Sequence, residues 1–186
     1  GTRIAYQVFG RGKPIVIANG IGVLHPGLVN QILHLRDRYQ VVTWDYRGSG
    51  GSRLAHPDAD VSMGTHARDL LAVLDHLGID RAVLVGWSMG VQVDLEVARL
   101  RPGLPRAFVA LFGTYGQPFR NATPFPLCLG VEAFWKTAAR VPGLWGGFAR
   151  LGVYMPGVSL PLLRGLGFIS ETTDDTVFLS NVSNVA

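Results

Sequence analysis

The sequence is poor in cysteine, and its first residues lack the features of a secretion signal. Cys128 is the only cysteine among 186 residues, which excludes an internal disulfide and favours a reducing compartment. Residues 2–9 alternate polar and apolar side chains as a strand does, without the apolar segment of a signal peptide. We therefore expect a cytoplasmic protein.

Long hydrophobic runs are also missing. The best candidate, residues 151–163, contains Pro156 and Pro161 and is bounded by Arg150 and Arg164. It falls short of the roughly 20 apolar residues that a membrane-spanning helix needs. The composition, 48% hydrophobic and 16% charged, is typical of a globular chain. We expect no stable membrane insertion, and the sequence does not indicate an oligomeric state.

Charge of one sign is not concentrated anywhere along the chain. The net charge is +4, with Lys13 and Lys136 the only lysines, and both residues 1–116 and 117–186 are only mildly positive. A nucleic-acid-binding protein would gather its basic residues on one face or in one run. We expect ordinary solubilising charge and no nucleic-acid partner.

Spacings typical of metal sites are absent from the sequence. The five histidines and one cysteine form neither an HExxH pattern nor paired cysteines. We therefore expect no metal site and no cofactor.

What is present over residues 1–116 is an alternation of strands and helices. Residues 14–18 and 82–85 are short apolar runs, as in strands covered on both faces. Residues 65–77 carry leucines at helical spacing, and Gly78 ends that helix. The alternation predicts an α/β fold, a mostly parallel sheet with helices on both faces. The predicted strands are 3–9, 14–18, 39–44, 82–85 and 106–112, and the predicted helices are 26–38, 65–77 and 88–101.

The composition changes from residue 117 onward. Proline, glycine and aromatic residues become dense, and short helical pieces replace strands. We predict a core domain over residues 1–116 and an all-helical cap over residues 117–186 that lies above the sheet.

The sharpest chemical signal is the G-x-S-x-G sequence over residues 86–90. It joins a predicted buried strand to an amphipathic helix, so Ser88 is expected on a tight, strained turn. A side chain at Gly86 or Gly90 would collide with the neighbouring strand or helix. The turn would raise the Ser88 hydroxyl above the sheet edge, and the Met89 N–H would face a developing oxyanion. The alternative is that Ser88 only caps the helix, a common role for serine, but capping does not account for the two glycines.

A glycine-rich loop, residues 19–22, follows the predicted strand 14–18. Such a loop can turn a backbone N–H toward a site above the sheet. With Ser88 as nucleophile, the N–H of Ile21 would complete an oxyanion hole with that of Met89. The alternative is a tight turn that binds no ligand.

A third pattern, D-x-R-G-x-G-x-S, spans residues 45–52. With the oxyanion loop and the serine turn in the right order and spacing, the chain resembles the α/β-hydrolase superfamily over residues 3 to about 116. The resemblance implies a serine-nucleophile esterase or lipase type of enzyme, with Asp45 and Arg47 bracing their loop rather than reacting. Asn19 stands where that family usually has histidine, which leaves the backbone donor of the loop intact.

The acid and the base of a catalytic triad are not found. In this fold they follow the serine along the chain, yet every histidine precedes Ser88. Residues 113–115, an alternative position for the acid, are Gly-Thr-Tyr, and Asp174 and Asp175 are expected at a helix N-terminus or on solvated surface. We expect the chain to be truncated within the cap and, as printed, nearly inactive. The five histidines are His25, His34, His56, His66 and His76.

Two side chains near the serine are candidates for substrate contact. They are Trp87, beside the nucleophile, and His25, just past the oxyanion loop; for His25, loop packing or exposure is the alternative. His66 and His76 lie on a predicted helix and are expected to be at the surface or partly buried.

The combined pattern predicts hydrolysis of a carboxylic ester or related acyl compound through an acyl-enzyme on Ser88. Cleavage of C–C bonds and cofactor-free perhydrolysis use the same serine and stay open. The aromatic residues of the cap favour a hydrophobic small-molecule substrate, unless they only pack the cap onto the sheet. Serine rather than aspartate at position 88 disfavours the dehalogenases and epoxide hydrolases that the family also contains.

Two alternatives belong to other functional classes. A dinucleotide-binding domain also has glycines after its first strand and an acid after the next, here Gly20, Gly22 and Asp45. His25 occupies the place of its third glycine, and that fold does not explain the serine turn. The other alternative is a non-catalytic relative that keeps the fold for binding.

Overall fold

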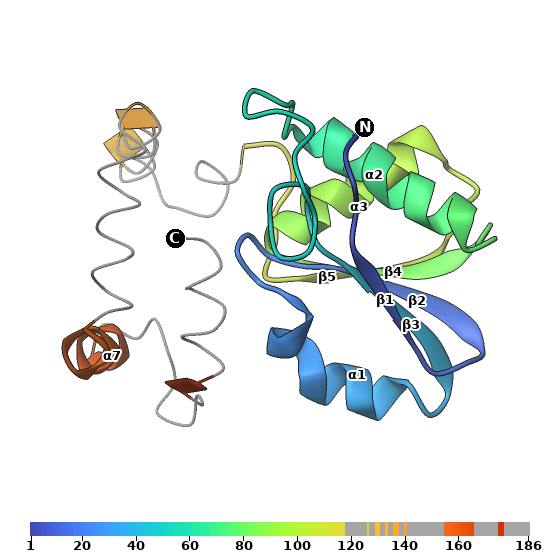
Figure 1. The fold of residues 1–186 in the computed structure, drawn as a ribbon, viewed down its shortest axis with the longest axis horizontal. Coiled ribbons are helices and arrows are strands. Elements are labelled where there is room, and N and C mark those ends of the chain that lie inside the picture. Colours follow the sequence, from blue (N-terminus) through green and yellow to red (C-terminus); the bar gives the residue numbers. More distant parts are fainter. Residues whose placement is uncertain are drawn as a thin grey trace.

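In the computed structural model, the strands of the described residues form one sheet (Figure 1). The structure describes residues 1–117, 126, 129–130, 133, 136–137, 140, 155–165 and 175–176, without the side chains of His25, Pro156, Leu162 and Leu163. Within these residues the strand order is β1-β3-β2-β4-β5, with β1 antiparallel to β3 and the other pairs parallel. The strands are β1 (Tyr6–Phe9), β2 (Lys13–Ala18), β3 (Tyr39–Trp44), β4 (Ala82–Trp87) and β5 (Pro105–Leu111).

The helices cover both faces of this sheet. A 3-10 turn, η1 (His25–Leu28), leads into α1 (Val29–Leu35) on one face, while α2 (Met63–His76) and α3 (Met89–Leu100) lie side by side on the other (Figure 1). Residues 26–38 were predicted as one helix, but Pro26 and Gly27 start it as a 3-10 turn and the regular helix ends at Leu35. The mostly parallel sheet with helices on both faces is confirmed.

Local sequence explains where α2 begins and ends. The Ser62 hydroxyl accepts a hydrogen bond from the Thr65 N–H at 3.4 Å, as an N-cap does. Gly78 follows the helix at a φ of 66°, a left-handed conformation that glycine adopts without a steric cost. Leu70 and Leu74 lie on the buried face, as their spacing predicted.

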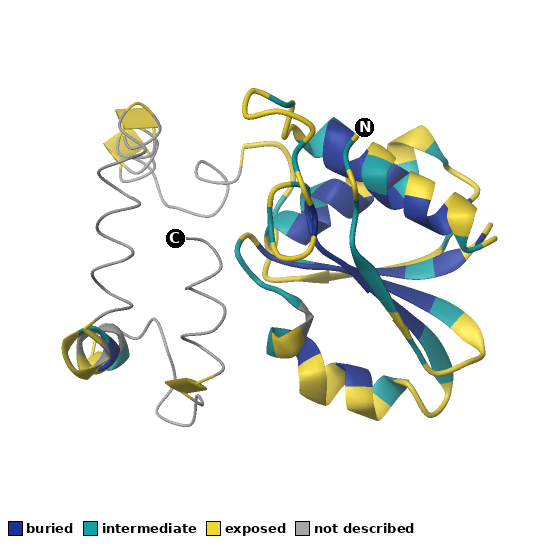
Figure 2. Ribbon diagram, viewed as in Figure 1, coloured by how far each residue is buried: buried dark blue, intermediate teal, exposed yellow. Residues whose placement is uncertain are grey.

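The core consists of two apolar clusters, one on each face of the sheet. Figure 2 shows buried residues along the strands and on the helices of both faces. The larger cluster joins α2 and α3 to the strands and includes Trp44, Leu70, Leu84 and Val97. The smaller one joins α1 to the sheet through Ile17, Leu28 and Ile32. Burial on both faces explains the apolar run Ile15–Ala18 in β2, and it also buries the last four residues of β3.

The described part of residues 117–186 contains one longer helix, α7 (Pro156–Gly165). Asp175 is exposed there and pairs with Arg164, whereas Asp174 and Cys128 lie outside the described residues. The division into a core over 1–116 and a cap over 117–186 stays a prediction. Among the described residues, no helix has the length and apolar character needed to cross a membrane.

Candidate active site

Ser88 occupies the turn between β4 and α3 and is exposed. Its φ is 53° and its ψ −115°, a conformation that L-residues rarely adopt. The Ser88 N–H donates to the Leu111 carbonyl at 2.9 Å, and the Ser88 carbonyl accepts from the Val91 N–H at 3.1 Å. These bonds hold the strained backbone in place. The side chain makes no capping hydrogen bond, so the interpretation of Ser88 as a simple helix cap has no support.

The two flanking glycines are required by close backbone contacts. A Cβ at Gly86 would lie 2.7 Å from the backbone of Val91, and one at Gly90 would lie 1.9 Å from the carbonyl oxygen of Ala18. Both distances are impossible without movement of the backbone. The prediction that side chains at these positions would collide with the neighbouring helix and strand is confirmed.

A third glycine packs against the same turn and was not identified from the sequence. A Cβ at Gly113 would lie 2.3 Å from a methyl group of Val91 and 2.6 Å from the Ser88 carbonyl oxygen. Gly113 comes two residues after β5. Its place after a strand that neighbours β4 is the signal that could have found it.

The loop of residues 19–22 begins directly beside the serine. A Cβ at Gly20 would lie 3.4 Å from the Ser88 Cβ and 3.9 Å from its Oγ. Within the described residues, the N–H groups of Ile21 and Met89 have no acceptor among the turn and loop hydrogen bonds. The Met89 N–H is also at the N-terminus of α3, where helix N–H groups are free to bind an anion. The structure thus brings the loop, the serine and the helix N-terminus together.

The segment after β3 is held by hydrogen bonds to Asp45. The Gly51 N–H donates to Asp45 Oδ2 at 2.9 Å, and the Ser52 hydroxyl donates to the Asp45 carbonyl at 2.7 Å. Ser52 Oγ also accepts from the Ala5 N–H at 2.9 Å. Asp45 therefore braces its loop, as expected from the resemblance.

Arg47 of the same segment pairs with Asp69 on α2. Its Nε and a terminal nitrogen donate to the two carboxylate oxygens at 2.7 and 2.6 Å. These hydrogen bonds raise the pKa of Arg47. The bracing role expected for Arg47 is also confirmed.

The two predicted substrate contacts have different surroundings. Trp87 is partly buried and packs against the apolar cluster on the α1 face. His25 starts η1, but its side chain lies outside the described residues. Contact of either side chain with a substrate stays a prediction.

His66 was expected at the surface or partly buried, and this expectation is wrong because the residue is buried. It is 5% exposed, and its ring lies 4.8 Å from that of Tyr46, centroid to centroid. Burial lowers the pKa of His66, and this effect outweighs the nearby carboxylates, which raise the pKa. His76 is exposed, as expected. No hydrogen bond joins a histidine to Ser88 within the described residues.

A buried acid on α3 was missed in the sequence. Asp94 is fully buried, and neither of its carboxylate oxygens has a hydrogen-bond partner in the described part of the chain. Burial raises its pKa to about 8. Asp94 lies between Val93 and Val97, both in the core, so helical spacing could have indicated its buried position.

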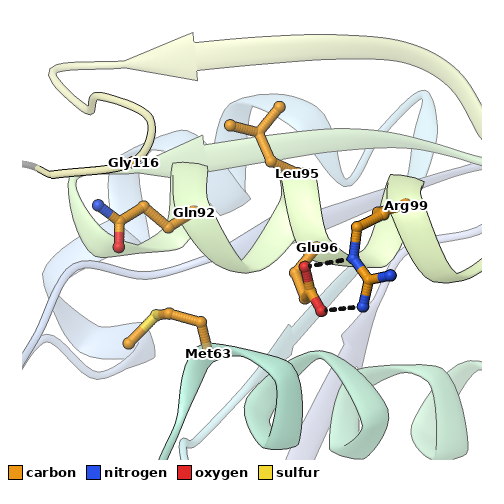
Figure 3. A pocket seen from close by; sticks show the side chains of 6 residues that line it. All are labelled: Met63, Gln92, Leu95, Glu96, Arg99 and Gly116. Atoms are coloured by element: carbon orange, nitrogen blue, oxygen red, sulfur yellow. Dashed lines mark hydrogen bonds and ion pairs between the residues drawn. The ribbon is translucent and has the colours of Figure 1, made fainter.

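A cavity of about 320 Å³ lies beside α3, and Ser88 does not line it (Figure 3). Glu96 and Arg99 face each other at its edge in a two-bonded ion pair, with distances of 2.9 and 2.6 Å. We do not assign the reaction to this cavity because it lacks the serine. Its lining residues are Met63, Gln92, Leu95, Glu96, Arg99 and Gly116.

A family model described as the alpha/beta hydrolase fold matches residues 13–126. The chain belongs to this family. A relative in Klebsiella pneumoniae strain 342, RutD, is named as a candidate carbamate hydrolase and is 36% identical over 103 residues. That match covers 55% of this chain and 38% of RutD, so it spans well under half the length of this relative.

Solved α/β-hydrolase structures have the same fold. An esterase from Thermogutta terrifontis is 28% identical, with a TM-score of 0.56 over 60% of this chain and 40% of the esterase. A candidate epoxide hydrolase from Pseudomonas aeruginosa is 26% identical, with a TM-score of 0.75 over 98% of this chain and 61% of that protein. The family match favours an α/β-hydrolase over the dinucleotide-binding alternative.

Proposed function

We propose that the protein is a serine hydrolase that cleaves a carboxylic ester or a related acyl compound. The observation that carries the proposal is the exposed Ser88 at a φ of 53°, with the Gly20 backbone beside it and the N-terminus of α3 directly after it. We infer an arrangement in which the N–H groups of Ile21 and Met89 lie beside this hydroxyl, because Ile21 directly follows Gly20 and Met89 begins α3. It is the arrangement that attack on a carbonyl needs.

In the proposed mechanism Ser88 Oγ attacks the carbonyl carbon of the substrate and gives its proton to a general base. The N–H groups of Ile21 and Met89 donate hydrogen bonds to the resulting oxyanion. The alcohol leaves with a proton, and water then hydrolyses the acyl-enzyme and restores Ser88. Residues 89–186 contain no histidine, so we expect residues 1–186 alone to react slowly.

The choice of an acyl substrate rests on the chemistry of residue 88. A serine hydroxyl forms an ester with the acyl group, an intermediate that water can cleave. The relative RutD is named for carbamate hydrolysis, which supports carbamates as a second candidate class of substrate. Carbamates present a carbonyl carbon similar to that of an ester. Serine at this position disfavours the epoxide chemistry named for the structural relative from P. aeruginosa.

We further propose that the acyl group is hydrophobic. Ile21 follows β2 and is 75% exposed, and Phe112 follows β5 and is 93% exposed. The carboxyl ends of parallel strands meet at one edge of a sheet, so both apolar side chains lie at the edge that carries Ser88. The aromatic residues of the predicted cap, which the sequence suggested as contacts for a hydrophobic substrate, lie outside the described residues.

A covalent probe separates this proposal from a non-catalytic relative. An organophosphonate reacts with an activated serine, and we expect the intact protein to gain one adduct, on the peptide that contains Ser88. Ser88→Ala should abolish the adduct, whereas Ser49→Ala, outside the β4–α3 turn, should keep it. A folded protein that gains no adduct would favour the binding-protein alternative.

A further inference from the structure

A buried hydroxyl anchors the peptide that precedes the proposed oxyanion loop. The Tyr46 hydroxyl donates to the Asn19 carbonyl at 2.6 Å, and the two residues are 6% and 1% exposed. Asn19 immediately precedes Gly20, which lies beside Ser88. The hydrogen bond therefore fixes the backbone one residue before the loop turns toward the serine.

The first turn of α3 packs against the same carbonyl. A Cβ at Gly90 would lie 3.0 Å from the Asn19 carbonyl oxygen. Gly90 directly follows Met89, whose N–H is the second proposed oxyanion donor. Asn19 is thus the point at which the loop, Tyr46 and the start of α3 meet.

Asp94 lies one turn further along α3, on the same face as Gly90, because residues four apart on a helix lie above one another. Burial and, to a smaller extent, the charge of Asp94 raise the pKa of the Tyr46 hydroxyl. A buried carboxylate without a hydrogen bond is strongly disfavoured. Burial raises the pKa of Asp94 to about 8, so the side chain is mainly the neutral acid at pH 7.

We propose that Tyr46 and Asp94 are positioning residues for the oxyanion loop. Tyr46 holds the Asn19 peptide so that the Ile21 N–H faces the space beside Ser88. When Asp94 is neutral, the Tyr46 hydroxyl keeps its hydrogen bond to the Asn19 carbonyl. An ionised Asp94 would compete for that hydrogen bond, since carboxylates are stronger acceptors than carbonyls. The role in catalysis rests on the proposed function of Ser88; the effect on the loop does not.

Other titratable groups around Tyr46 do not change charge between pH 7 and 9. The His66 ring packs on Tyr46, and burial lowers its pKa, so it is neutral above pH 7. Arg47 stays charged because its hydrogen bonds to Asp69 raise its pKa. Asp60, whose charge also acts on His66, has a pKa lowered to about 2 by hydrogen bonds from Thr65 and Ser62. Of the groups named here, Asp94 is the one whose pKa lies in this range.

Tyr46→Phe tests the anchor with two measurements on the intact protein. We expect labelling of Ser88 by the organophosphonate to slow about tenfold, the effect of losing one buried hydrogen bond. Hydrogen exchange at residues 20–23 should become faster by a similar factor. Tyr39→Phe removes a hydroxyl from the start of β3 and should change neither rate. Unchanged labelling and exchange in folded Tyr46→Phe would overturn the proposal.

Asp94→Asn tests the acid through a pH profile that a purely structural role would not move. The ratio of the variant's labelling rate to that of the wild type should rise several-fold from pH 7 to pH 9, because only the wild type has an acid at position 94 that ionises. Asp94→Ala, which also cannot ionise, gives the same test if the Asn variant does not fold. A ratio that stays constant across this range would overturn the role of Asp94.

Failure of the proposed function would look different. In that case the wild type would not be labelled at all, although it is folded. Hydrogen exchange of residues 20–23 would still decide whether Tyr46 and Asp94 hold the loop. For Tyr46 the measurement is the exchange rate in Tyr46→Phe. For Asp94 it is the exchange rate in Asp94→Asn relative to the wild type, followed as the pH is raised.

Discussion

Arg47 and Asp69 form a two-bonded ion pair that ties the segment after β3 to helix α2. The side chains are only 13% and 12% exposed, and Arg47 also donates to the Asp60 carbonyl at 3.0 Å. The pair lies beside His66, whose pKa both charges influence. It therefore holds the loop of residues 45–52 against the helix that packs on Tyr46.

Asp69→Asn should lower the free energy of unfolding by about 2–3 kcal/mol, because it removes the ion-pair partner of the mostly buried Arg47. The matched control is Asp75→Asn, which removes a similar two-bonded pair with Arg101 between α2 and the end of α3. That pair is 58% and 35% exposed, so a much smaller change is expected. Denaturant unfolding measures both. Equal losses in the two variants would contradict the structural role assigned to Arg47.

Gly90→Ala should destabilise the protein by about 3 kcal/mol or more, since the added methyl group would lie 1.9 Å from the Ala18 carbonyl oxygen. Gly103→Ala is the control, because no atom lies within 4 Å of a Cβ at that position. Thermal unfolding should show a large drop in Tm for the first variant and almost none for the second. A well-tolerated alanine at position 90 would mean that α3 does not begin against β2 as described.

The buried Asp94 predicts a stability that falls as pH rises. Its pKa is raised from 3.8 to about 8 in the folded protein, so between these values the unfolded chain loses a proton that the folded chain keeps. Each unit of pH in this range reduces stability, and the loss is complete above pH 8. Asp94→Asn removes this dependence, and its stability relative to the wild type should increase from pH 5 to pH 8 by on the order of 3 kcal/mol. Denaturant unfolding at the two values tests this; a constant difference would show that Asp94 is ionised in the folded state.

Phe112→Ala should reduce the preference for long acyl chains. Phe112 is 93% exposed, and contact with an alkyl chain would contribute about 1 kcal/mol. We expect kcat/KM for an octanoyl ester to fall about fivefold relative to that for an acetyl ester in the intact protein. Phe108→Ala, within β5 and 40% exposed, should leave the ratio unchanged. Equal losses with both esters would place Phe112 outside the acyl site.

Much of the sheet and of the serine turn could be predicted because local patterns determine them. Two-sided burial makes most of β2 an apolar run, and helical spacing places Leu70 and Leu74 on the inner face of α2. The glycines at 86 and 90 are likewise required by contacts within one strand–turn–helix unit and the strand next to it.

The polar contacts of His66 and Tyr46 could not be predicted in the same way. His66 is a polar residue whose burial depends on a ring contact with Tyr46, twenty positions away and on another element. The hydrogen bond from Tyr46 to Asn19 likewise joins two separate loops. Such contacts have no local pattern, because they arise only when α2, α3 and the strand ends pack together.

The most direct test of the central claim is a crystal structure of the intact protein after reaction with the organophosphonate. We predict phosphorus bonded to Ser88 Oγ, with the phosphoryl oxygen about 2.7–3.1 Å from the backbone nitrogens of both Ile21 and Met89. An unmodified Ser88, or an adduct whose oxygen faces away from these two N–H groups, would contradict the account.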